Sequence, residues 1–354
     1  MSKLRVGVIF GGMSSEYEIS LKSVVSVINS IPKDRYEIVC VGITKKGRML
    51  YYPGSIDLIE NDEWYKHSDC VTAVISPDRS HTGLLKLLDD GTYSLLKLDC
   101  VFPVLHGRYG EDGCIQGLLA MSGIPYVGCD TYSSSVCMDK DATHALTQAA
   151  GIKSAKWISI RKSALADLDQ ICSSLESELG MPIFVKPANT GSSVGISKAK
   201  DKAQLREAIK IAFTHDDKVV AEECIEGIEA EIAVMGTTEN PIVSEVGQII
   251  PANEFYDYDA KYNNALSKTI IPAKISPEKR AEIAEIAAKT YKILGCRGLS
   301  RIDFFVTPAG EIYLNEVNTM PGFTNISMFG KLFEYSGIPY PELLERLIEI
   351  GMVV

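Results

Sequence analysis

The chain has 354 residues, of which 46% are hydrophobic and 23% charged, a composition typical of a globular protein with two or three domains. Its formal net charge of −10 argues against a nucleic-acid partner, whose phosphates require a basic surface. No apolar stretch approaches the ~20 residues that span a bilayer, and the N-terminus lacks the pattern of a signal peptide. The nine cysteines are an odd number and form no C-x-x-C pair, so we expect reduced thiols in a cytoplasmic protein without a membrane partner.

The N-terminal third, 1–128, is predicted to be an α/β domain. The apolar runs 4–10, 36–44 and 99–107 are typical of strands buried on both faces of an open parallel sheet. An amphipathic helix is expected over 18–30. All three strands end in polar or glycine-rich turns, and ligand sites of open parallel sheets lie at such strand ends.

The middle region, 129–221, is predicted to be a smaller α+β domain. Its strands are expected at 155–160, 182–188 and 218–227, and its helices at 162–178 and 201–213. The segment GISKAK would return beside the second of these strands as its hairpin partner. The hairpin would then bracket a loop rich in glycine and serine.

This loop, TGSSVG (190–195), is a candidate phosphate-binding loop. Backbone N–H groups of a glycine-rich turn can hold phosphate oxygens, and Ser192 and Ser193 add hydroxyl donors. It is not a P-loop, because Lys186 precedes the glycines instead of following them. A tight hairpin loop without a ligand is the alternative reading of the pattern. Lys140, in CMDKDA, would by default be a surface charge at the start of a helix.

The last third, 222–354, is predicted to contain strands and one long helix. The expected elements are strands at 229–236 and 240–250, a helix over 277–294, and a hairpin of 300–306 and 311–318 around the turn TPAG. A polar, tyrosine-rich segment, 253–268, shows no clear periodicity.

The hairpin around TPAG is a candidate metal site. Apolar side chains alternate to one face of its first strand, which leaves Arg301 and Asp303 on the other. Glu316 and Asn318 are two residues apart and share a face, which is also the face of Asp303 if the loop keeps an even count. Two carboxylates and an amide oxygen suit Mg²⁺, which prefers oxygen ligands. From spacing alone, a solvated strand face with a surface ion pair remains an equal alternative.

Seven segments, taken together, resemble the D-alanine–D-alanine ligases of the ATP-grasp superfamily. They are GGMSSEYEISLKS, PVLHGRYGEDGCIQGLL, MDKDATHAL, FVKPANTGSSVGISK, FYDYDAKY, SRIDFF and NEVNTMPGFTNIS. The resemblance extends over essentially the whole chain. It implies a three-domain ATP-grasp fold that binds ATP between the middle and C-terminal domains, an enzyme of peptidoglycan synthesis, and a homodimer.

The resemblance also implies a set of nucleotide and metal contacts. Lys140, Lys186 and Ser193 match phosphate-binding residues, and TGSSVG matches a loop that closes over the phosphates. Glu222 matches the adenine-binding segment and Glu229 the ribose-binding acid; Glu223 stands where a basic or polar residue is common. Asp303, Glu316 and Asn318 match the ligands of two Mg²⁺ ions, for which Mn²⁺ could substitute.

Further matches concern the two D-amino acid substrates. Such ligases phosphorylate the carboxylate of one D-alanine, and the amine of the second amino acid then attacks the acyl phosphate. Glu16, Ser192 and Tyr262 match a hydrogen-bonded triad that holds the first D-alanine. Arg301 and the N–H of Gly322 match groups that stabilise the charge that develops during the reaction. Ser327 matches the residue that contacts the carboxylate of the second substrate. His106 matches a residue near the first substrate, with a satisfied core histidine as the alternative.

The second substrate is open on the sequence alone. The stretches VGCD, SSSVCMDKDA and GCRGLSRIDFF look closer to the D-alanine–D-serine ligases of vancomycin resistance, but those carry arginine where this chain has Met328. An apolar residue at that position would form a wall suited to the methyl group of D-alanine. More distant alternatives are another ATP-grasp carboxylate–amine ligase and a non-catalytic nucleotide-binding regulator. The former would lack GGMSSEYEIS and FYDYDAKY, and the latter would have lost Glu316 or Arg301.

Overall fold

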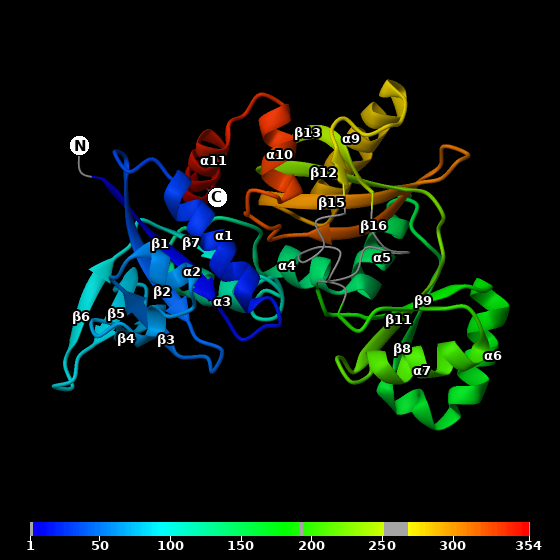
Figure 1. Cartoon of the computed structure of the whole chain (residues 1–354), viewed down its shortest axis with the longest axis horizontal. Coiled ribbons are helices and arrows are strands. Elements are labelled where there is room, and N and C mark those ends of the chain that lie inside the picture. Colours follow the sequence, from blue (N-terminus) through cyan, green and yellow to red (C-terminus); the bar gives the residue numbers. More distant parts are fainter. Residues whose placement is uncertain (1–2, 192–193, 251–267, 354) are drawn as a thin grey trace.

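The computed structural model describes residues 3–191, 194–250 and 268–353, which form three β-sheets. In Figure 1 the first sheet lies on the left, the second at the lower right and the third in the upper half of the molecule. This arrangement confirms the predicted combination of α/β and α+β parts. None of the helices in the described ranges is long and apolar enough to cross a membrane.

The first sheet has seven strands in the order β6-β5-β4-β3-β2-β1-β7. They are β1 (Leu4–Gly11), β2 (Tyr36–Ile43), β3 (Met49–Tyr52), β4 (Val71–Ile75), β5 (Gly83–Leu87), β6 (Tyr93–Lys97) and β7 (Cys100–Val104). The three predicted strands are β1, β2 and β7, and β1 pairs in parallel with both of the others. Strands β3 to β6 extend the sheet by antiparallel pairing, so the sheet is mixed and only its central part is parallel.

The additional strands carry a weak sequence signal because they are short and only partly buried. Strand β6 has no buried residue, whereas β1 is buried from its third residue onward. The helical elements of this region are α1 (Tyr17–Ser30), α2 (Ile56–Glu60), the 3-10 turn η1 (Trp64–Lys66) and α3 (Cys114–Ser122). Helix α1 packs against β1 and β7 through Leu21, Val24 and Val27, which confirms the predicted amphipathic helix.

The second sheet has four antiparallel strands in the order β10-β9-β11-β8. They are β8 (Trp157–Arg161), β9 (Ile183–Pro187), β10 (Ser197–Ala199) and β11 (Lys218–Glu223). The 3-10 turn η2 (Lys162–Asp167) and the helices α6 (Leu168–Leu179) and α7 (Lys202–Ala212) accompany them, and the two helices share a core with the sheet. Strands β9 and β10 form the hairpin that the sequence predicted around the glycine- and serine-rich loop.

Two helices of the predicted middle region also contact the third sheet. Helices α4 (Thr131–Met138) and α5 (Lys140–Ala149) contact β16 of the third sheet, and Cys137 and Ile152 belong to the core of that sheet. Strand β11 runs through Glu223, two residues beyond the expected boundary at 221. Helix α5 also contacts β8 of the second sheet, and the range 129–221 for the middle domain stays a prediction.

The third sheet has five antiparallel strands in the order β14-β13-β12-β15-β16. They are β12 (Ile228–Gly236), β13 (Pro241–Ile250), β14 (Lys268–Ile270), β15 (Gly298–Val306) and β16 (Ile312–Asn318). One face packs on α9 (Pro277–Ile293) through Ile302 and Phe304. The helices α10 (Met328–Tyr335) and α11 (Tyr340–Val353) share a core with Ala233 and Leu299 at one end of the other face. Arg301 and Asp303 lie on this second face, as the alternation predicted.

The C-terminal helix joins the third sheet to the first. Helix α11 packs against α1 and β7, and Arg35 forms ion pairs with Glu345 and with Glu349, the latter at 3.2 Å. The rings of Phe102 and Phe323 meet edge to face at a centroid distance of 5.4 Å. The first and third sheets thus share one continuous core.

Candidate active site

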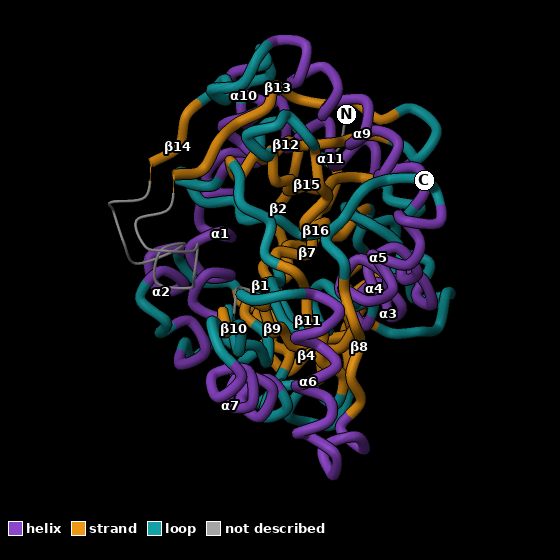
Figure 2. Tube along the Cα trace, turned by 90° about the vertical axis from the view of Figure 1, so that its right-hand side faces the viewer, coloured by secondary structure: helices purple, strands orange, loops and turns teal. Residues whose placement is uncertain are grey.

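A cleft that is open to solvent lies between the second and third sheets. The tube in Figure 2 shows β9 and β11 below β15 and β16. The polar lining of the cleft consists of Lys186, Glu222 and Glu223 from the second sheet and Glu229, Glu231, Asp303, Asn315 and Glu316 from the third. Apolar side chains, among them Phe184, Ile196 and Phe305, complete the wall. This mixture suits a ligand with an apolar ring and a charged end.

Lys186 is held in the cleft by a buried carboxylate. Its Nζ lies 2.7 Å from Oε2 of Glu222, whose Oε1 bonds Nε2 of His144 at 3.1 Å. Glu222 is 5% exposed. Burial alone would raise the pKa of Glu222, but the Lys186 ammonium and His144 lower the pKa to about 2. Glu222 is therefore ionised at neutral pH and fixes the position of Lys186.

Lys140 connects α5 to the base of the glycine- and serine-rich loop. Its backbone N–H donates to the carbonyl of Ala188 at 3.1 Å, and its Nζ donates to the carbonyl of Thr190 at 2.9 Å. Lys140 thus bonds the segment that leads into the loop from β9, the strand that carries Lys186. Ser192 and Ser193, the predicted hydroxyl donors, lie outside the described residues.

A row of acidic side chains crosses three strands of the third sheet. In the strand pairing Asp303 lies between Glu231 and Glu316. Arg301 holds Asp303 with two hydrogen bonds of 2.8 and 2.7 Å, and its Nε lies 3.3 Å from Glu231. Burial would lower the pKa of Arg301, but Asp303 and Glu231 raise it well above its usual value. The arginine is thus a permanent cation in an acidic surrounding.

Asn318 brings the third predicted metal ligand to this cluster. Its Nδ2 lies 3.0 Å from Asp303 and 3.5 Å from Glu316. Two carboxylates and an amide therefore converge at one place, and the amide can present its oxygen after a flip of the side chain. This donor set fits a hard divalent cation. Among the residues that the structure describes, no group of three or more His, Cys, Asp or Glu side chains forms a metal site, so an ion here would depend on the asparagine.

Glu16 faces the same loop from the N-terminal domain. It lies at the start of α1 and is 5% exposed. A Cβ on Gly191 would be 3.1 Å from its Oε2, and a Cβ on Gly107 would overlap that oxygen. The left-handed backbone of Gly107, with φ 69°, and its closeness to the carboxylate both require glycine. Tyr262, the third member of the expected triad, lies outside the described residues.

A second, partly buried carboxyl group accompanies Glu16. Oε1 of Glu111 accepts a hydrogen bond of 2.8 Å from the N–H of Gly107. Burial and the Glu16 carboxylate raise the pKa of Glu111 to about 8. Glu111 belongs to the segment HGRYGEDG but was not among the predicted site residues, because nothing in its local pattern indicates that it faces Glu16.

His106 is bonded to protein groups through both ring nitrogens. Nδ1 lies 3.0 Å from the carbonyl of Met320, and Nε2 lies 3.1 Å from Oγ of Ser23. Burial lowers the pKa of His106 to about 4, against the effect of the Met320 bond. This is the arrangement of the satisfied core histidine, and it fixes the segment before Gly322 to the N-terminal domain.

Gly322 and Ser327 lie together, whereas Met328 points away from them. A Cβ on Gly322 would be 2.6 Å from Oγ of Ser327, which bonds the hydroxyl of Thr324 at 2.8 Å. Met328 is 4% exposed, belongs to the core, and presses its Cε against the backbone of Gly247. This side chain fills the space between α10 and β13, and the wall for the second substrate at Met328 stays a prediction.

Glu231 in the cleft lining and His144, the partner of Glu222, were also missing from the predicted site residues. Glu231 follows Glu229 by two positions on a strand, so alternation could have placed it on the same face. His144 lies in the quoted segment MDKDATHAL, but its partner Glu222 is 78 positions away, and only the fold brings them together.

The chain is similar to known proteins over most of its length. Residues 5–129 match a family model described as the D-ala D-ala ligase N-terminus, and residues 146–349 match the D-ala D-ala ligase C-terminus. The chain is 47% identical to the D-alanine–D-alanine ligase of Caldicellulosiruptor bescii over 99% of this chain and 96% of the relative. It is 40% identical to D-alanine–D-alanine ligase A of Escherichia coli, again over 99% of this chain and 96% of the relative.

Two solved structures are similar over nearly their whole length. The VanG D-Ala:D-Ser ligase from Enterococcus faecalis superposes with a TM-score of 0.90 at 41% identity, covering 99% of this chain and 100% of that one. The D-alanine–D-alanine ligase from Coxiella burnetii gives a TM-score of 0.84 at 33% identity, covering 99% and 95%.

Proposed function

The chain belongs to the D-alanine–D-alanine ligase family, and we propose that it joins two D-alanine molecules with the use of ATP to supply a precursor of peptidoglycan. The observation that carries the proposal is the cleft between the second and third sheets. There Lys186 faces an acidic row that includes Asp303 and Glu316. A cation on one wall and carboxylates on the other suit a polyphosphate bound through metal ions.

The nucleotide occupies this cleft. Lys186 and Lys140 bind its phosphates, with the loop at 190–195, including Ser193, closing over them. Glu222 holds Lys186 in place, so the ammonium is ordered before ATP arrives and less entropy is lost on binding. Glu229, on the cleft wall, accepts the ribose hydroxyls.

Asp303, Glu316 and Asn318 would hold Mg²⁺, two ions by resemblance to the family, with Mn²⁺ as a substitute. When bound, divalent cations neutralise charge on the phosphoryl oxygens. Arg301, already ordered by Asp303, keeps a positive charge beside the transferred group at any pH at which the protein is folded.

The amino acids lie where the N-terminal domain meets the third sheet. Glu16 holds the ammonium of the first D-alanine, together with Ser192 and Tyr262, and the loop beside Gly191 closes the site. Closure excludes water from an acyl phosphate that water would hydrolyse. The backbone N–H of Gly322 stabilises the oxyanion, and the adjacent Ser327 binds the second carboxylate.

Location and assembly are part of the same proposal. A cytoplasmic protein is supported by nine free cysteines, since thiols persist in a reducing compartment. A homodimer is proposed from family resemblance, and light scattering on the purified protein tests it: a monomer mass at assay concentration would refute the dimer.

The ligase proposal is tested by incubating the protein with ATP, Mg²⁺ and D-alanine. We expect ADP and phosphate to appear in step with D-alanyl-D-alanine, and L-alanine to be inactive. ADP release without dipeptide for any pairing of amino acids would overturn the assignment.

D-Serine is a second candidate for the accepted amino acid. The likeness to the VanG D-Ala:D-Ser ligase from Enterococcus faecalis favours it. Equal concentrations of D-alanine and D-serine, with both dipeptides counted by mass spectrometry, decide between them. We expect D-alanyl-D-alanine in excess; an excess of D-alanyl-D-serine would make the second candidate the better description, with a role in antibiotic resistance.

A further inference from the structure

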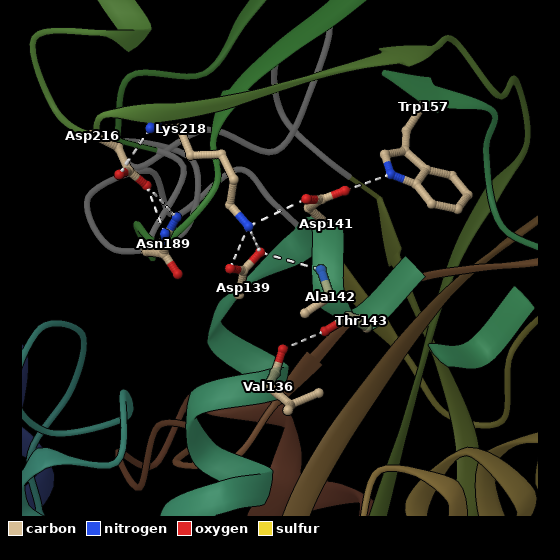
Figure 3. Close-up of polar contacts among 9 residues, drawn as sticks. All are labelled: Val136, Asp139, Asp141, Ala142, Thr143, Trp157, Asn189, Asp216 and Lys218. Carbon is tan, nitrogen blue, oxygen red and sulfur yellow. Dashed lines mark hydrogen bonds and ion pairs between the residues drawn. The ribbon is translucent and has the colours of Figure 1, made fainter. Parts of the chain in front are cut away.

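A buried lysine outside the assigned site organises the start of α5. Lys218, the first residue of β11, has a side chain only 9% exposed. Its Nζ bonds both carboxylate oxygens of Asp139, one of them at 2.6 Å, and lies 3.3 Å from Asp141 (Figure 3). These two aspartates flank Lys140 in the sequence.

Each aspartate also has a second hydrogen-bonding partner. Asp139 is the N-cap of α5 and accepts a hydrogen bond of 3.2 Å from the N–H of Ala142. Asp141 accepts one of 2.9 Å from Nε1 of Trp157 on β8. The first turn of α5, which carries Lys140, is therefore fixed to the second sheet by charged groups of both signs.

The backbone around Lys218 also holds the base of the phosphate loop. The carbonyl of Lys218 accepts from the N–H of Ala188 at 2.9 Å. The N–H of Lys218 donates to Asp216 at 3.2 Å, and Asp216 accepts two hydrogen bonds from Asn189, at 2.7 and 2.9 Å. Figure 3 shows Lys218 between these two groups, with Asn189 and Asp216 on one side and the two aspartates of α5 on the other.

The charges explain why a lysine is needed here. Without Lys218, two carboxylates would stand beside Lys140 near the binding site of a polyphosphate. They would attract the Lys140 ammonium, and they would repel the phosphates at short range. In the structure the ammonium of Lys140 instead lies on the carbonyl of Thr190, at the loop.

We propose that Lys218 is a positioning residue that takes up the charges of Asp139 and Asp141 and so directs Lys140 toward the loop and the phosphates of ATP. The inference rests on the proposed role of Lys140 in phosphate binding. Lys218 makes no contact with substrate in this scheme. It acts by balancing charge and by fixing the direction in which Lys140 points.

The test compares Lys218→Met, which keeps the length of the side chain, with Lys218→Arg, which keeps the charge. For Lys218→Met we expect the KM for ATP to rise about tenfold to a hundredfold, the usual effect of losing a hydrogen bond to a charged group, with the KM for D-alanine unchanged. Lys218→Arg should stay near the wild type. The matched control is Lys162→Met, which removes an exposed lysine that pairs with Asp217 at 2.9 Å. Direct calorimetric titration with ATP should show the same order of affinities without turnover.

A charge-rescue variant separates positioning from packing. Asn is as good an N-cap as Asp, so Lys218→Met combined with Asp139→Asn removes the uncompensated charge and keeps the cap. This pair should bind ATP more tightly than Lys218→Met alone. If Lys218→Met does not fold, the pair decides by itself, and ATP affinity near the wild type supports the proposal.

Two results would overturn it: an unchanged KM for ATP in Lys218→Met, or a loss of affinity that the second substitution does not relieve. Failure of the ligase proposal is a separate outcome, because the wild type would then make no dipeptide at all.

Discussion

Asp303 lies directly opposite Glu316 on neighbouring strands, although the loop that joins these strands would not place it there. The paired ends Val306 and Ile312 enclose residues 307–311, an odd number, and a regular ladder from that turn would set Asp303 opposite Asn315. A β-bulge between Asp303 and Phe304 shifts the register by one residue. The loop therefore does not keep the even count on which the predicted shared face depended, yet Asp303 and Glu316 do share a face. Bulges are typical devices for re-aiming side chains next to active sites.

The first prediction concerns Glu316 on this face. Glu316→Gln should lower kcat by about 10²–10³ or more, because the variant loses charge where the phosphoryl group is transferred. The control is Glu311→Gln on the same hairpin, whose carboxylate pairs with Lys153 at the surface. Steady-state rates of ADP release with D-alanine measure both. A Glu316→Gln enzyme as active as the control would show that the hairpin is not the metal site.

The second prediction is an acid-dependent stability that originates at Glu222. Its folded-state pKa of about 2 is below the ordinary value of 4.5, so its stabilising effect is complete above pH 4.5 and is lost as the pH falls toward 2. As the pH falls through this range, protonation of Glu222 should lower the unfolding free energy of the wild type by on the order of 3 kcal/mol. The Glu222→Gln variant has no such group and should not show this loss. Urea titrations at neutral and acidic pH measure the difference between the two proteins. A difference that does not shrink toward acidic pH contradicts the prediction.

Local patterns predicted part of the site because they depend only on neighbours in the chain. Alternation placed Arg301 and Asp303 on one face, and the apolar runs located the central strands of the first sheet. The same reasoning applied to α10 would have placed Met328 in the core, since residues 328, 329, 332 and 333 form one apolar stripe and all are buried.

Other features could not be read from the chain in this way. The ion pair between Lys218 and Asp139 joins positions 79 residues apart; Asp139 belongs to the segment MDKDATHAL, but Lys218 belongs to none of the recognised segments. The closeness of Glu111 to Glu16 depends on the path of the backbone through Gly107. Such pairings follow from the packing of whole elements, so they emerge only in three dimensions.

The third prediction tests whether the phosphate loop closes on the first substrate site. In Gly191→Ala the new methyl group would lie 3.1 Å from the Glu16 carboxylate and would push it from its position. We expect the KM for D-alanine at the first site to rise about tenfold, as for overpacking by 1–2 kcal/mol. Gly117→Ala is the control, because the nearest atoms to its Cβ are 3.8 Å away. Equal KM values in the two variants would place the loop away from Glu16.

The fourth prediction concerns Glu111, whose pKa moves in the opposite direction to that of Glu222. Its folded-state pKa of about 8 exceeds the ordinary 4.5, so the stability it contributes is complete below pH 4.5 and is lost as the pH rises through 8. Glu111→Gln should therefore gain stability relative to the wild type as the pH is raised across this window. Thermal midpoints at about pH 5 and about pH 8.5 measure the effect, and Glu176→Gln gives the effect of losing one surface charge. A constant offset between wild type and variant would mean that Glu111 is ionised throughout.

The last prediction follows from the burial of Met328. Arginine at this position would have to place a guanidinium where the methionine Cε now presses on Gly247, and a buried cation without a partner is strongly unfavourable. We therefore expect Met328→Arg to lower the unfolding free energy by several kcal/mol and to reduce all ligation, rather than to redirect it toward D-serine. Met328→Leu, which keeps the volume, should cost less than about 1.5 kcal/mol and leave the products unchanged. Thermal unfolding and the D-alanine against D-serine competition are measured on the same preparations. A stable Met328→Arg enzyme that makes mainly D-alanyl-D-serine would show that the start of α10 can turn this side chain to the substrate.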